Sequence, residues 1–165
     1  MKGKILIALI IILAAIQFIR PEKNKSAELM PGDITTVYDV PGDVNNILKK
    51  ACNDCHSNNT VYPWYAEMQP VGWWLNHHIV EGKEELNFSE FAHYPVAVQY
   101  HKLEEMIEQI KEDEMPLSSY TLIHIDARLT DAEKQSLLNW SQSVRDTIKA
   151  KYPADSLVLK RRAPK

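Results

Sequence analysis

Three stretches of the chain place apolar residues along one side of a helix. After Pro41 the apolar positions follow the i, i+3, i+4, i+7 spacing of one helix face: Val44, Ile47, Leu48 and Ala51. Residues 94–116 carry a second stripe, made of Val96, Tyr100, Leu103, Met106, Ile107 and Ile110. A third follows Thr130 and Glu133, which have capping-box spacing, and consists of Leu137, Trp140, Val144 and Ile148. No alternating strand pattern persists, so the sequence predicts an all-α fold.

Prolines and glycines predict where several elements end. A short helix is expected over 70–82, beginning at Pro70 and ending at Gly82. Pro116 should stop the helix of the second stripe and hold Met115 in an extended conformation. Residues 34–38 are expected to form a short extended piece.

The amino terminus has the pattern of an export segment. Lys2 and Lys4 precede an apolar run over residues 5–16 that continues to Ile19. The run is about 15 residues, short of the ~20 of a relaxed membrane span, but no cleavage site is evident. We favour an uncleaved anchor over a cleaved signal. The predicted organisation is a signal or anchor over 1–20, a linker over 21–40, a domain over 41–150 and a tail over 151–165.

Composition narrows the class of protein further. The chain has 165 residues, of which 45% are hydrophobic and 25% charged, as in an ordinary globular domain. Its net charge of −3 leaves no electrostatic footprint for nucleic acid. A domain of this size buries a core without disulfides, so its 2 cysteines are expected to serve chemistry.

Both cysteines lie in the segment "ACNDCHSNNT", where a histidine follows the second. On one helical turn Cys52 and Cys55 are neighbours, close enough to join the two vinyl groups of one porphyrin, and His56 can then ligate the iron. In an exported chain this motif is typical of c-type haem attachment.

Three other uses of the cysteines are weaker. A structural zinc site needs a second ligand pair at regular spacing, and His77 and His78 are adjacent. A thioredoxin-like dithiol is expected in an alternating α/β fold, and a disulfide closing so short a loop stabilises little.

A second axial ligand for the iron has several candidates. Met115 is favoured because it follows a helix, precedes a proline and lies in an irregular loop. Met68, His77 and His78 remain alternatives, as does an open site. A Met/His pair raises the reduction potential above that of bis-histidine ligation.

The stretch 51–91, together with "DEMPLSSYTLIH" and "ARLTDAEKQSLLNW", resembles the haem-binding domain family of small bacterial c-type cytochromes. The resemblance covers roughly residues 38–146. It implies a class I cytochrome c-like helical fold around one haem c, attached through Cys52, Cys55 and His56. The Met115–Pro116 pair matches the place where class I cytochromes supply their methionine. The aromatic segment 61–95 is long for a minimal cytochrome, and its role is not implied by the resemblance.

These observations predict a monohaem c-type cytochrome that carries single electrons on the periplasmic side of a bacterial inner membrane. Its redox partners are not identified by the sequence, and no substrate chemistry is expected. A haem-based sensor or a peroxidase-like enzyme, with an open sixth iron site, is the alternative.

Overall fold

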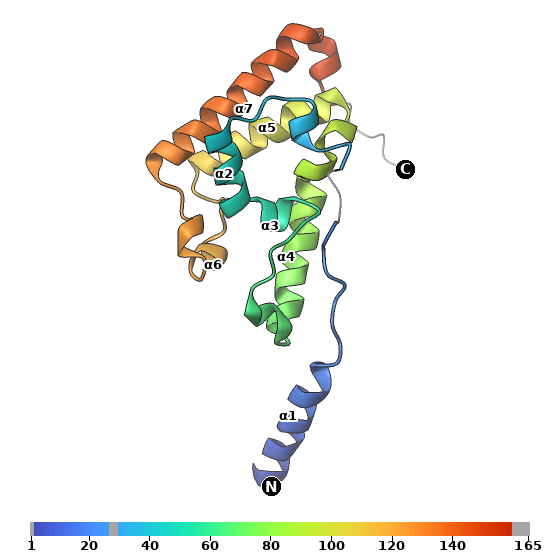
Figure 1. The fold of residues 1–165 in the computed structure, drawn as a ribbon. Helices are drawn as coiled ribbons and strands as arrows, with labels where there is room; N and C mark the ends of the chain where they lie inside the picture. Colours follow the sequence, from blue (N-terminus) through green and yellow to red (C-terminus); the bar gives the residue numbers. More distant parts are fainter. Residues whose placement is uncertain (1, 27–29, 160–165) are drawn as a thin grey trace.

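The computed structural model describes residues 2–26 and 30–159, and within these residues it is helical with no β-strand. Figure 1 shows the arrangement of the elements. The α-helices are α1 (Lys2–Ile16), α2 (Gly42–Ala51), α3 (Asn53–His56), α4 (Val71–Glu85), α5 (Val96–Lys111), α6 (Ser118–Thr121) and α7 (Asp131–Lys151). Short 3-10 helices are η1 (Ile34–Thr36), η2 (Trp64–Glu67), η3 (Phe88–His93), η4 (Ile125–Ala127) and η5 (Ala154–Leu157). The all-α prediction is confirmed.

The core forms where α5 and α7 pack along each other and α2 packs on α7. All four residues of the predicted α2 stripe and all four of the α7 stripe are buried. On α5 the four inner members of the stripe are buried, whereas Val96 and Tyr100 are half-buried at its edge. Thr130 and Glu133 cap α7 reciprocally, as their spacing predicts. Helical periodicity therefore located the main packing faces correctly.

Helix α4 does not end at Gly82, as the sequence predicted, but continues to Glu85. Gly82 instead allows α4 to approach α3 closely. A Cβ atom added at Gly82 would lie 2.8 Å from the carbonyl oxygen of Cys55. The glycine is selected by packing against the cysteine motif rather than by helix termination.

The end of α5 also differs from the prediction. The helix stops at Lys111, before Pro116, and Asp113 adopts a left-handed conformation with φ of 60°. Aspartate is among the few residues that tolerate this conformation. The amides of Glu114 and Met115 then donate to the carbonyl of Gln109, at 3.0 and 3.2 Å. Asp113, rather than the proline, redirects the chain.

The expectation of an extended piece over residues 34–38 is wrong. Ile34 begins the 3-10 helix η1, which is capped by the side chain of Asp33. Ile34 is buried in the main core, and η1 packs against η3. A single core contact far away in the sequence fixes this segment, which local periodicity does not report.

Helix α1 extends away from the rest of the molecule, and none of its 15 residues is buried. Among the residues that the structure describes, no helix combines the length and apolar character needed to cross a membrane. The predicted bounds of the segment, linker, domain and tail stay predictions. Part of the tail, residues 160–165, lies outside the described residues.

Candidate functional site

Two adjoining cavities lie between the cysteine motif and the loop that follows α5. The larger has a volume of about 480 Å³ and the smaller about 280 Å³. Six residues line both: Ala51, Cys52, His56, Glu85, Met115 and Pro116. The larger continues along apolar side chains of α5 and α7, including Met106, Ile110 and Leu137. Together they offer a mostly apolar space of the size that small-molecule and cofactor sites have.

The two cysteines face this space as free thiols. Cys52 lines both cavities and Cys55 lines the smaller one. Burial raises the pKa of Cys52 to about 12, with a contribution from the neighbouring Cys55. Burial, followed by the charge of Asp54, raises the pKa of Cys55 to about 11. Neither sulfur is a thiolate at neutral pH, which does not suit a redox dithiol or a zinc ligand.

His56 is held in one orientation by the backbone. Its Nδ1–H donates to the carbonyl oxygen of Leu86, at 2.9 Å. Because this bond occupies Nδ1, the other nitrogen, Nε2, keeps its lone pair. Burial lowers the pKa of His56, against the opposing effect of the Leu86 hydrogen bond. The imidazole is therefore neutral near pH 7 and suited to ligate a metal.

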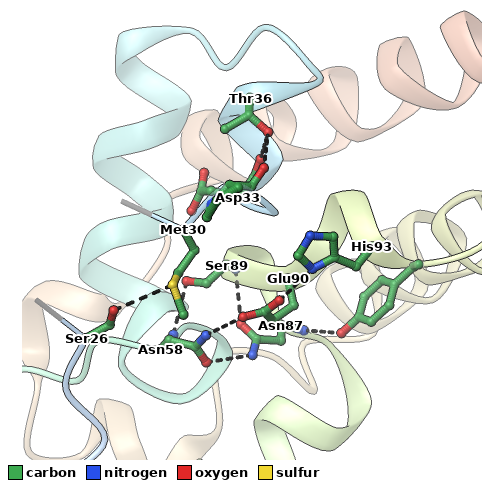
Figure 2. A network of polar contacts seen from close by, with 11 residues as sticks. Ser26, Met30, Asp33, Thr36, Asn58, Asn87, Ser89, Glu90 and His93 are labelled. Atoms are coloured by element: carbon green, nitrogen blue, oxygen red, sulfur yellow. Dashed lines mark hydrogen bonds and ion pairs between the residues drawn. The ribbon is translucent and has the colours of Figure 1, made fainter. Parts of the chain in front are cut away.

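A polar network fixes the turn that carries Leu86 (Figure 2). The side chain of Asn87 donates to Oδ1 of Asn58 at 2.8 Å and accepts from the amide of Ser89 at 3.1 Å. The amide of Asn58 donates to the hydroxyl of Ser89, and its side chain donates to Glu90. The segment after the cysteine motif is thereby joined to the turn whose carbonyl orients His56.

Met115 lines both cavities from the loop after α5. Its amide is tied to Gln109, and Asp113, two residues earlier, forms an ion pair with Lys134 of α7. The structure thus brings Met115 to the same space as Cys52, Cys55 and His56, as the sequence analysis expected of this set.

Charged groups gather at the α4–α5 side of the larger cavity. The ammonium of Lys102 lies 3.1 Å from a carboxylate oxygen of Glu85 and 2.7 Å from one of Glu105. Burial lowers the pKa of Lys102, but the two carboxylates outweigh this and raise it above its ordinary value. Among the residues lining the larger cavity, Lys102 is the one ammonium or guanidinium group.

The alternative ligands occupy different positions. His78 lines the smaller cavity, with its ring edge-on to Trp74 at 4.5 Å between centroids. His77 is exposed and pairs with Glu81. Met68 is exposed and lines neither cavity. Of the three, His78 alone faces the site.

Three residues that position the site were missed by the sequence analysis: Gly82, Leu86 and Asn87. Leu86 acts through a carbonyl that no side-chain pattern reveals. Asn87 was detectable in part, because Asn two residues before Ser89 is a usual turn and helix-capping arrangement. Its pairing with Asn58 depends on chain folding.

The donor set matches the needs of a covalently held haem. Two neutral thiols, a neutral imidazole with one free nitrogen and a thioether share one apolar space. No group of three or more His, Cys, Asp or Glu residues that could hold a metal ion is found within residues 2–26 and 30–159. A closed protein-only zinc site is therefore not supported.

Comparisons with known proteins agree with this geometry. The model of a family described as the haem-binding domain matches residues 11–143. No curated protein and no solved structure matches the chain. The match covers most of the sequence and includes every residue of the candidate site. The chain belongs to the haem-binding domain family.

Proposed function

We propose that the protein is a monohaem c-type cytochrome that carries single electrons on the periplasmic side of a bacterial inner membrane. One observation carries the proposal: Cys52, Cys55, His56 and Met115, which come from two separate segments, meet at the walls of two adjoining cavities. The family supports haem binding, and the covalent attachment and the electron-carrier role are our inference from the residues.

Cys52 and Cys55 are suited to form two thioethers. In each, the sulfur bonds to one carbon of a vinyl group and the thiol hydrogen goes to the other carbon. The addition is balanced and needs no external oxidant. Both cysteines are unpaired with each other, so no disulfide must first be reduced.

His56 and Met115 are proposed as the axial ligands. When bound, haem supplies reversible one-electron exchange at its iron. His56 offers Nε2, because its Nδ1–H is committed to Leu86. Met115 offers a neutral thioether, which favours a higher potential than a second imidazole would. The apolar side chains of α5 and α7 exclude water from the site.

The amino terminus supports an extracytoplasmic location. Helix α1 presents an apolar surface with Lys2 and Lys4 at its start. We propose that it directs export and either stays in the inner membrane or is cleaved after export.

The visible spectrum tests this function. Protein matured with a c-type haem assembly system should show the narrow reduced bands of a six-coordinate, low-spin haem. It should exchange one electron reversibly and bind carbon monoxide slowly in the ferrous form. Rapid carbon monoxide binding would instead indicate an open sixth site and favour the sensor or peroxidase alternative.

A further inference from the structure

The end of the molecule that faces α1 carries an exposed apolar surface built from two segments. From η2 and the start of α4 come Trp64, Met68 and Trp74, and from the loop after α6 come Leu122, Ile123 and Ile125. Trp64 is 77% exposed and Leu122 72%. We call these six residues the apolar end.

The two segments are fixed side by side. A hydrogen bond of 2.6 Å joins the hydroxyl of Tyr65 in η2 to Nε2 of His124 in the loop after α6. The ring of Tyr120 stacks on His124, and its hydroxyl donates to Asp54 of α3, at 2.7 Å. The apolar end is therefore one connected surface on the rigid part of the molecule.

The same end is bonded to the chain that leaves α1. Gln17 and Gln69 form two reciprocal hydrogen bonds, at 3.0 and 2.9 Å. The indole Nε1 of Trp73 donates to the carbonyl of Ile19, and Glu67 pairs with Arg20. Figure 1 shows that η2 and the start of α4 lie at the end of the body nearest α1.

Helix α1 is too short to meet a bilayer without help. Its 15 residues span about 22 Å at 1.5 Å per residue, against a hydrocarbon thickness of about 30 Å. Because its far end is bonded to η2, a bilayer that takes up α1 must come against the apolar end. Tryptophan favours the membrane–water interface, and the basic Arg20 and Lys23 lie at that junction.

We propose that the apolar end is a lipid-facing surface that seats the haem domain on the bilayer and fixes its orientation. This assigns a role to part of the aromatic segment 61–95. The inference rests on the proposed membrane insertion of α1, and it goes beyond anchoring because it places Trp64 and the 122–125 loop in the headgroup region.

Reaction of single introduced cysteines with a charged, membrane-impermeant maleimide tests the seating. The full-length holoprotein is placed in phosphatidylcholine–phosphatidylglycerol vesicles, and labelling is followed by intact mass. The variants are Trp64→Cys, Leu122→Cys, Ile10→Cys and, as the matched control, Val158→Cys, whose parent residue is 64% exposed on the carboxyl-terminal side of η5. The unsubstituted holoprotein gives the background.

Positions 64 and 122 are expected to react at least about tenfold more slowly than position 158, because an interfacial thiol is shielded from the charged reagent. Equal rates at 64, 122 and 158, with position 10 still protected, would overturn the seating and leave the anchor intact. Reaction at position 10 would remove the anchor and this inference together. Protection that grows with the protein-to-lipid ratio would mean that a second copy covers the surface, and would overturn the lipid assignment. The visible spectrum of each sample reports the haem proposal separately.

Discussion

The two sides of the candidate haem site are built differently. The His56 side is held by the Leu86 carbonyl, the Asn58–Asn87 network and the close approach of α4 at Gly82. The Met115 side is a loop tied by its amide to Gln109 and by the pairing of Asp113 with Lys134.

This difference separates two tasks. The histidine side is preorganised by buried bonds, so its disruption should cost both folding and haem retention. The methionine side is held by fewer and more exposed bonds, so its disruption should change the properties of the iron while the fold persists. The predictions below test that division, from the largest effect to the smallest.

Substitution His56→Ala should have the largest effect. It removes the ligand that the buried side of the site is arranged to orient, so we expect near-background haem content after maturation. His78→Ala is the control, because His78 faces the smaller cavity without a backbone bond recorded to its ring. Haem absorbance per polypeptide measures both. Equal haem content in the two variants would contradict the assignment of His56.

Substitution Gly82→Ala should destabilise the domain by roughly 1–3 kcal/mol, because the new methyl group would overlap the backbone of Cys55. Alanine's better helix propensity offsets about 1 kcal/mol of this. Gly42→Ala is the control, since a Cβ there meets nothing within 4 Å. Urea unfolding of both variants gives the comparison, and equal stability would show that α4 and α3 do not need this close contact.

Substitution Met115→Ala should leave the fold near its original stability but shift the visible spectrum toward high spin and lower the reduction potential. Loss of the thioether removes the ligand that favours the ferrous state. Each fall of about 59 mV is a tenfold change in a one-electron equilibrium. Met68→Ala is the control, because Met68 lies outside both cavities. An unchanged Met115→Ala spectrum would point to another ligand, with His78 the first to examine.

Substitution Asn87→Ala should cost about 2 kcal/mol, since it removes two buried side-chain hydrogen bonds worth about 1 kcal/mol each. We expect the loss to loosen His56 as well, so the haem should dissociate or change spin at lower denaturant concentration. Asn139→Ala, on the exposed face of α7, should change stability by less than about 0.5 kcal/mol. Parallel unfolding curves followed by far-UV dichroism and by haem absorbance separate the two effects. Coincident behaviour of both variants would remove the network from the account.

Substitution Thr130→Ala should have the smallest effect, about 1 kcal/mol, because it removes the amino-terminal cap of α7 without touching the site. Thr147→Ala, exposed within the same helix, should be neutral or slightly stabilising. Thermal unfolding measures the difference, and the reduction potential should not move. A shifted potential in Thr130→Ala would mean that α7 helps to set the iron environment.

The sequence predicted what local spacing encodes. The stripes of α2 and α7, the Thr130 cap and the cysteine motif all follow from residue periods or short spacings, and the structure has them in place. The Gly82 contact and the buried Ile34 depend on segments far apart in the sequence, and both were misread. The carbonyl of Leu86 has no side-chain signature at all. The residues that carry the chemistry were thus accessible, and those that orient them were not.

Intact-mass spectrometry of the protein from its native host tests the central claim most directly. The account predicts the polypeptide mass, with or without the segment 1–20, plus one tetrapyrrole that survives denaturation. The double variant Cys52→Ala, Cys55→Ala should lose that increment and release any bound haem into acidified organic solvent. A bare polypeptide with both thiols free to react in the native material would contradict the account.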